Sequence, residues 1–289
     1  AVIKGADITT ESAVKIAKQY GVSEFLIGLT IIAFGTSLPE LASSLTAVIY
    51  NTPEIAVSNI IGSNIANIGL VLGLTAIIFS KKIRCNIKKR DIYFLLFSVL
   101  AMIAALMDYR LTFAEGIVFI LLYISYILYS VKSHKLKNIS PHKKIDFTNL
   151  VRLIIGLILL VAGAKYFITS GIELINLLGI SASAFGFLFV AVGTSLPELA
   201  SSLIAMKKKH NGLAVGNIIG SNLFNTFFVF GAMTSINIIP VIESFYLSAI
   251  PMLVILTVML YLATVRKKLT RFDGILFLAL YLISLVRVF

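Results

Sequence analysis

Apolar stretches of about 20 residues recur along almost the whole chain, and this recurrence limits the folds that the chain can adopt. A helix of about 20 residues spans the roughly 30 Å of hydrocarbon in a bilayer. In lipid, only helices and closed barrels satisfy every backbone hydrogen-bonding group, and these stretches are too long for barrel strands. The expected spans are 23–50, 54–80, 91–108, 112–131, 150–178, 181–206, 212–236, 241–265 and 270–289, after an amphipathic helix at 1–20. The chain is therefore predicted to be an all-α membrane protein of about ten transmembrane helices.

The charged residues support this class and indicate an orientation. They make up 13% of the chain, against about a quarter in typical soluble domains, which excludes an ordinary soluble enzyme. The net charge is +12, and 21 of the 25 Lys and Arg fall on alternate connectors. Those connectors are 15–22, 81–90, 132–152, 207–211 and 266–271. By the positive-inside rule they face the cytoplasm. The excess charge thus predicts a multi-pass protein of the cell membrane with both termini outside, and no nucleic-acid partner.

An internal repeat relates the two halves of the chain at a single offset of 158 residues. The segment Gly35–Leu45 is identical to Gly193–Leu203. The segment Asn59–Asn64 is identical to Asn217–Asn222 at the same offset. Two blocks in one register indicate a duplicated unit of about five helices. Because five is odd, the second unit must enter the membrane from the opposite side, and such inverted repeats are typical of secondary transporters.

The repeat also predicts the organisation of the chain. We expect a first unit of five helices at 1–131, a basic cytoplasmic linker at 132–149 and a second, inverted unit of five helices at 150–289. The segment 1–20 is shorter than its partner 150–178. We therefore expect the first helix to lack its initial turns, through natural truncation or through cleavage.

Two acidic residues, Glu40 and Glu198, lie in the middle of predicted spans and at equivalent positions of the repeat. A charged residue at membrane depth is costly and is rarely kept without a role. Pro39 and Pro197 precede them, and a proline lacks the N–H that would bind the carbonyl four residues earlier. A structural carboxylate and a kink that serves only packing are the alternatives. The duplication favours one shared cation site between the two halves.

Hydroxyl and amide side chains surround both glutamates. Four hydroxyls precede them, and a stripe at i, i+4 spacing follows on the next helix of each half. The hydroxyls are Thr36, Ser37, Thr194 and Ser195, and the stripes are Asn59, Ser63, Asn67 and Asn217, Ser221, Asn225. Each hydroxyl could instead bond to its own helix, and each stripe could join helices. Ligands that are all oxygen suit calcium, sodium and magnesium, and they argue against zinc, copper or iron.

Two other classes of membrane protein fit less well. An intramembrane protease would need an HExxH helix or a catalytic pair of aspartates, and apart from Asp7 in the first helix no aspartate lies in the middle of a predicted span. A cation channel could also use a pair of glutamates. Channels, however, usually build their pores from symmetric subunits or parallel repeats. The inverted repeat therefore favours a transporter over a channel.

The motifs Gly35-Thr36-Ser37-Leu38-Pro39-Glu40 and Gly62-Ser63-Asn64-Ile65-Ala66-Asn67, with their copies from Gly193 and Gly220, resemble those of the calcium/cation antiporter superfamily. Within it the chain is most similar to the prokaryotic sodium/calcium exchangers. The resemblance covers nearly the whole chain. It implies ten helices, alternating access in which the first and sixth helices slide as the gate, and exchange of about three sodium ions for one calcium ion. We expect a monomer in lipid that carries calcium and sodium and needs no cofactor.

The same resemblance implies a set of ligands by motif position. Calcium would be bound by Glu40, Glu198 and the carbonyl oxygens of Thr36 and Thr194. Sodium would be bound by Ser37, Glu40, Ser63, Asn67, Ser195, Glu198, Ser221 and Asn225, with the carbonyls of Ala33 and Ala191. Potassium-dependent relatives tend to have Asp in place of Asn225, so potassium independence is expected. Calcium/proton exchange and potassium-dependent exchange stay open as alternatives.

Overall fold

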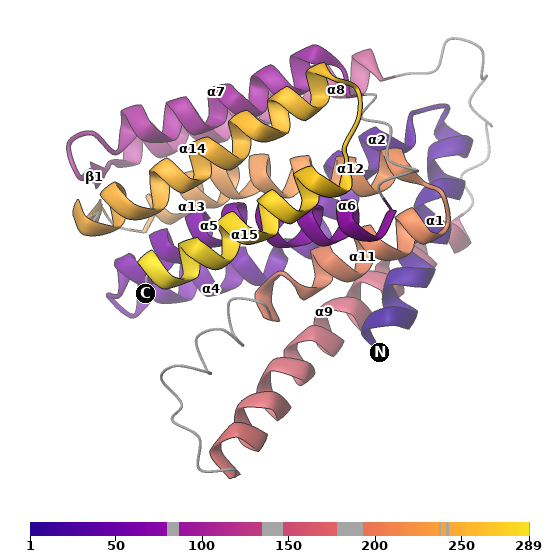
Figure 1. The fold of residues 1–289 in the computed structure, drawn as a ribbon, viewed down its shortest axis with the longest axis horizontal. Helices are drawn as coiled ribbons and strands as arrows, with labels where there is room; N and C mark the ends of the chain where they lie inside the picture. Colours follow the sequence, from indigo (N-terminus) through magenta and orange to yellow (C-terminus); the bar gives the residue numbers. More distant parts are fainter. Residues whose placement is uncertain (80–86, 135–146, 178–192, 237, 241–242, 289) are drawn as a thin grey trace.

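The computed structural model describes residues 1–79, 87–134, 147–177, 193–236, 238–240 and 243–288, and these are almost entirely helical (Figure 1). The first half contains α1 (Val2–Tyr20), α2 (Glu24–Ile27), η1 (Gly28–Ile32), α3 (Ala33–Thr36), α4 (Leu38–Ile49), α5 (Pro53–Ala66), η2 (Asn67–Leu72), α6 (Gly73–Phe79), α7 (Lys89–Ala105) and α8 (Phe113–Ser133). The second half contains α9 (Phe147–Leu177), α11 (Leu196–Lys207), α12 (Asn211–Leu223), η3 (Phe224–Val229), α13 (Phe230–Met233), α14 (Glu243–Val265) and α15 (Arg271–Val288). The η elements are π-helical segments. Strands β1 (Arg110–Leu111) and β2 (Ile239–Pro240) pair antiparallel and join two connectors.

The helices end close to the predicted breaks, which confirms the all-α class. Four helices among the described residues are long and apolar enough to cross a membrane: Pro53–Phe79, Phe113–Ser133, Phe147–Gly171 and Asn211–Met233. The pair Glu24–Thr36 and Leu38–Ile49 passes the same test as one span that is bent by 43°. Of the expected span 181–206, the structure describes only the part from residue 193 onward. The number of ten transmembrane helices stays a prediction.

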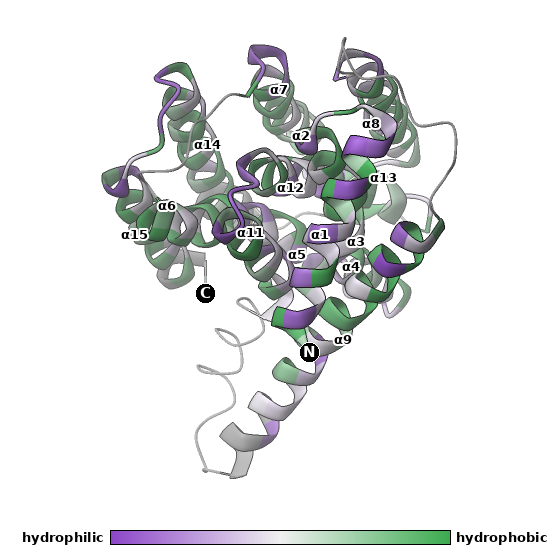
Figure 2. Ribbon diagram, turned by 90° about the vertical axis from the view of Figure 1, so that its right-hand side faces the viewer, coloured by the Kyte–Doolittle hydropathy of each residue, from purple (hydrophilic) through white to green (hydrophobic). Residues whose placement is uncertain are grey.

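The two helices that follow the glutamate motifs form the centre of the bundle. The apolar windows of Pro53–Phe79 and Asn211–Met233 are 83% and 94% buried, whereas those of α8 and of Phe147–Gly171 are only 22% and 28% buried. Figure 2 shows hydrophobic residues along most helices, and hydrophilic residues near helix ends and along α1. An apolar wall that is exposed on peripheral helices fits contact with lipid. The polar residues at the centre are therefore held away from both lipid and water.

The local structure repeats at the offset found in the sequence. The four non-glycine residues with positive φ among the described residues form two pairs, Asn51 with Lys209 and Tyr109 with Lys267, and each pair is 158 residues apart. Thr112 and Glu115 form a capping box at the start of α8. The equivalent Thr270 and Asp273 make the same reciprocal hydrogen bonds at the start of α15. The duplication thus extends to backbone conformation, while the opposite orientation of the halves stays a prediction.

Glycines bring one helix of the first half against the centre of the second. A Cβ added at Gly216 in α12 would collide with the carbonyl of Phe25 in α2. A Cβ added at Gly28 in η1 would collide with the carbonyl of Leu213 in α12. The two backbones therefore touch, which larger side chains would prevent. This contact fixes the helix that carries the first glutamate motif against the second half.

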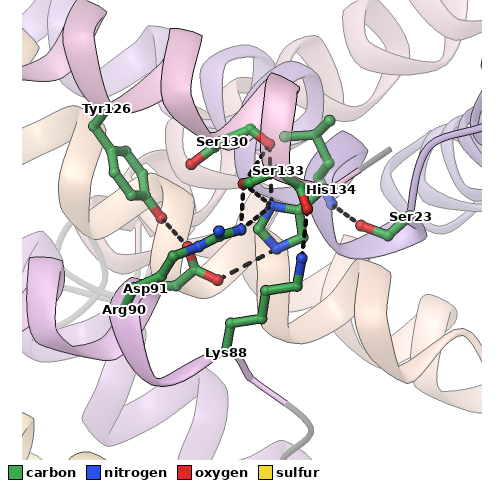
Figure 3. Close-up of polar contacts among 9 residues, drawn as sticks. Ser23, Lys88, Arg90, Asp91, Tyr126, Ser130, Ser133 and His134 are labelled. Carbon is green, nitrogen blue, oxygen red and sulfur yellow. Dashed lines mark hydrogen bonds and ion pairs between the residues drawn. The ribbon is translucent and has the colours of Figure 1, made fainter. Parts of the chain in front are cut away.

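A buried polar cluster, which we call the Asp91 cluster, holds the α7–α8 hairpin to the start of α2 (Figure 3). Its centre is the Asp91 carboxylate, which is 0% exposed. Tyr126 donates a hydrogen bond of 3.1 Å to it, and His134 Nε2 lies 3.3 Å from its Oδ2. Arg90 completes the cluster, with Nε 3.5 Å from Asp91 Oδ1 and Nη2 3.2 Å from His134 Nδ1. The backbone N–H of Ser23 donates to the carbonyl of His134, so the cluster anchors α2, which continues toward the glutamate motif.

Candidate ion-binding site

The helix that carries each glutamate is broken just before it. Ser37 separates α3 from α4 with φ −91° and ψ 9°, and Ser195 precedes α11 with φ −86° and ψ 6°. Pro39 and Pro197 occupy the first turns of α4 and α11, where a missing N–H costs nothing to the new helix. The helix before each break nevertheless loses one hydrogen bond, because the carbonyl of Gly35 or Gly193 has no N–H partner four residues on. The structure therefore has the predicted kink in the first half, as a bend of 43°.

Both glutamates lie inside the protein and contribute to one polar region. Glu40 is 1% exposed and Glu198 is 0% exposed. The Ser37 hydroxyl donates a hydrogen bond of 3.0 Å to Oε1 of Glu198, which joins the first motif to the second. Oε2 of Glu40 and Oε2 of Glu198 have no hydrogen-bond partner among the described residues. The two carboxylates thus keep free oxygens where water cannot reach them.

More unpartnered oxygens are buried within the two repeated motif segments. They come from both halves and are buried amide or hydroxyl atoms: Asn64 Oδ1, Asn67 Oδ1, Ser195 Oγ, Ser221 Oγ, Asn222 Oδ1 and Asn225 Oδ1. A buried polar atom without a partner costs about 1–3 kcal/mol, so proteins rarely keep several together without a ligand. The amide oxygens can only accept hydrogen bonds, and the hydroxyl oxygens also carry lone pairs, so a bound cation would satisfy both kinds of atom. The region therefore has the chemistry of a site for hard cations.

Some of the expected sodium and calcium ligands are already engaged within the protein. The Ala33 carbonyl accepts the backbone N–H of Ser37 at 3.0 Å and the Thr36 hydroxyl at 3.3 Å. The Thr36 hydroxyl also lies 3.2 Å from Oδ1 of Asn217. Ser63 is 4% exposed and Thr194 is half-buried. Ala191 lies outside the described residues.

Within each polar stripe, the first residue joins neighbouring helices and the third residue keeps an oxygen available for an ion. Asn59 donates to the carbonyl of Glu40 at 3.2 Å and to Ser44 at 2.9 Å. Its equivalent Asn217 donates to Ser201 at 2.9 Å and to Ser202 at 3.2 Å. The first residue of each stripe therefore joins neighbouring helices. The third residues, Asn67 and Asn225, keep unpartnered amide oxygens.

Sequence reasoning did not single out Asn64, Asn222 or Thr226 as site residues. Asn64 donates a hydrogen bond of 2.8 Å to the Thr226 hydroxyl, and Asn222 donates one of 3.4 Å to the Asn64 carbonyl. All three residues are at most 2% exposed. The available signal was the repeated block that ends in Asn64 and Asn222. Nothing in that block shows that the two asparagines meet in space.

The ligand chemistry of this region is oxygen alone. Among the described residues, no group of three or more His, Cys, Asp and Glu lies close enough to hold a metal ion. Two carboxylates with neutral amide and hydroxyl oxygens bind calcium or sodium better than soft transition metals. Their charge of −2 balances one divalent ion or about two monovalent ions.

Comparisons with known proteins agree with this chemistry. The family model described as "Sodium/calcium exchanger protein" matches residues 1–132 and 148–289. An uncharacterized membrane protein of Methanocaldococcus jannaschii is 38% identical over 285 residues, which cover 97% of this chain and 92% of the relative. The sodium/calcium exchanger MaX1 of Methanosarcina acetivorans is 33% identical, over 99% of this chain and 95% of the relative. The solved structure of the sodium-calcium exchanger NCX_Mj soaked with 10 mM Na+ and zero Ca2+ has a TM-score of 0.89 at 36% identity, over 99% of this chain and 94% of that one.

Proposed function

Since the chain belongs to the sodium/calcium exchanger family, we propose that it is a secondary antiporter that moves calcium across the membrane against sodium by alternating access. About three sodium ions would exchange for one calcium ion, without potassium. The two units at 1–131 and 150–289 would have opposite orientations, with the linker 132–149 and the basic connectors in the cytoplasm. The protein would work as a monomer in the cell membrane, with both termini outside.

One observation carries this proposal: two buried carboxylates from equivalent positions of the two halves, each with an unpartnered oxygen. Their combined charge of −2 can neutralise one calcium ion or about two sodium ions, but it cannot neutralise both kinds of ion at the same time. The two ions therefore compete, and this competition couples their movements. At the helix break beside each glutamate, the carbonyl of Gly35 or Gly193 lacks the N–H donor four residues on, as in the discontinuous helices of many transporters.

The ligand assignment follows the motif positions. Calcium would lie between Glu40 and Glu198, with the carbonyls of Thr36 and Thr194. Sodium would be held by the two glutamates, by serine hydroxyls and by asparagine amides. These sodium ligands are Ser37, Ser63, Asn67, Ser195, Ser221 and Asn225, with the carbonyls of Ala33 and Ala191.

The experiment is calcium-45 uptake by proteoliposomes that hold the purified protein. Vesicles loaded with sodium and diluted into sodium-free medium should accumulate calcium, and vesicles loaded with choline should not. Uptake driven by a proton gradient without sodium would move the protein to the calcium/proton antiporters. A requirement for potassium would overturn potassium independence. Flux far above about 10⁴ ions per second without a counter-ion would contradict alternating access, because ions then follow a continuous pore.

A further inference from the structure

Two hydrogen bonds connect the halves of the protein where α5 meets the second half. Asn64 and Asn222 occupy equivalent positions of the repeat, and their side chains make different contacts. Asn222 donates to the backbone carbonyl of Asn64 at 3.4 Å. Asn64 donates instead to the hydroxyl of Thr226 at 2.8 Å. A perfect two-fold relation would have Asn64 donate to the carbonyl of Asn222.

The sequence explains this departure from symmetry. Thr226 in η3 is equivalent to Ile68 in η2. Both residues are buried, at 1% and 0% exposure. A hydroxyl accepts a hydrogen bond and an isoleucine side chain cannot. The second half therefore offers Asn64 an acceptor that the first half does not offer Asn222.

Each of these bonds acts on a turn that carries an expected sodium ligand. The Asn64 carbonyl also accepts the backbone N–H of Asn67, so Asn222 holds the turn at which Asn67 begins η2. Thr226 directly follows Asn225 in η3 and is held by the Asn64 amide. The amides of Asn67 and Asn225 both keep unpartnered oxygens. Asn67 is thus restrained through its backbone, and Asn225 through the side chain of the neighbouring Thr226.

We propose that Thr226, through its hydrogen bond with Asn64, is a positioning residue that makes the two amide ligands unequal and so sets the sodium dependence of exchange. This proposal rests on the proposed function, because it takes Asn67 and Asn225 as sodium ligands. Under that assignment the glutamates bind both ions, whereas Asn67 and Asn225 bind sodium alone, and the Asn64–Thr226 bond does not touch the glutamates among the described contacts. The sodium and calcium responses should therefore separate when the bond is removed.

The test compares Thr226→Val, which removes the hydroxyl at nearly constant volume, with Thr226→Ser, which keeps it. For Thr226→Val, the sodium concentration for half-maximal exchange should rise about two- to tenfold, the range expected for losing one buried hydrogen bond. The calcium concentration for half-maximal exchange should change less than about twofold. Thr226→Ser should behave like the wild type. In a double-mutant cycle, Thr226→Val should add nothing to Asn64→Ala.

Unchanged sodium dependence of Thr226→Val, or equal shifts for both ions, would overturn this proposal. Wild-type protein that shows no sodium-driven calcium uptake would instead overturn the proposed function itself, so the two failures are distinguishable. If Thr226→Val does not yield a monodisperse protein in detergent, Asn64→Ala removes the same bond from the other side. The same two half-maximal concentrations then decide the question.

Discussion

Replacing Glu198 with Gln removes one of two buried carboxylates and keeps the size of the side chain. In the wild type, the charges of Glu40 and Glu198 neutralise one calcium ion. In Glu198→Gln, bound calcium leaves a net charge of +1 at a position that is 0% exposed. An uncompensated charge at membrane depth costs at least about 2.5–3.5 kcal/mol, which corresponds to roughly 60- to 300-fold weaker calcium binding. We therefore expect calcium uptake to fall to background at concentrations that saturate the wild type.

The same change should not unfold the protein. The amide oxygen of Gln can still accept the hydrogen bond that Ser37 donates at 3.0 Å. Removing one of two buried like charges should also raise the melting temperature of the ion-free protein. Calcium-45 uptake and thermal unfolding in detergent, each with and without calcium, measure the two effects.

Glu173→Gln is the matched control, because Glu173 lies exposed on α9 and should tolerate the change. The equivalent change Glu40→Gln should abolish uptake as Glu198→Gln does. Retained calcium uptake in either site variant, at near wild-type affinity and with a folded protein, would refute the shared-site reasoning.

Two further predictions concern stability. Asp91→Ala leaves His134 and Arg90 without their buried acceptor and should lower the free energy of unfolding by about 3–5 kcal/mol. Asp108→Ala, at an exposed position, should have little effect. Equal melting temperatures for the two variants would contradict the structural role of the Asp91 cluster. Gly216→Ala places a Cβ against the Phe25 carbonyl and should lower the free energy of unfolding by about 1–3 kcal/mol. Gly62→Ala places its Cβ in open space and should leave the stability unchanged. Thermal unfolding of the two variants measures the difference, and wild-type stability of Gly216→Ala would contradict the backbone contact between α2 and α12.

The sequence was sufficient for the all-α class because lipid imposes simple rules on a chain that spans it. A span must be about 20 apolar residues long, so its ends can be located from polar breaks such as Asn51 and Asp108. The repeat then gave Glu40 and Glu198 equivalent positions in the two halves. The structure brings their motifs together through the Ser37–Glu198 hydrogen bond.

The rest depends on how the helices register against one another, which periodicity does not determine. Asp91 is the first residue of the expected span 91–108, and nothing in the sequence singled it out. Only the contacts between α7 and the end of α8 surround it with Tyr126 and His134. Asn64 looked like one more residue of a repeated block. Its contact with Thr226 joins residues 162 positions apart and breaks the symmetry that the sequence suggested.

A second asymmetry bears on the transport cycle itself. The Ser37 hydroxyl donates to Glu198, whereas the equivalent Ser195 hydroxyl and Oε2 of Glu40 have no partner among the described residues. In the proposed inverted repeat, exchanging the conformations of the halves produces the state that opens to the other side. That state should have Ser195 bonded to Glu40 and Ser37 released. Ser37→Ala and Ser195→Ala should therefore shift the equilibrium between the two states in opposite directions.

Accessibility of a cysteine introduced beside the site, labelled from each side of the membrane, measures this equilibrium. Ser37→Ala should reduce the population of the state of this structure, in which Ser37 bonds to Glu198, and Ser195→Ala should increase it. Shifts in the same direction would show that the two hydroxyls do not exchange roles. Opposite shifts would mean that the same duplicated motif that forms the site also provides its two conformations, because only one of the two serines bonds a glutamate at a time.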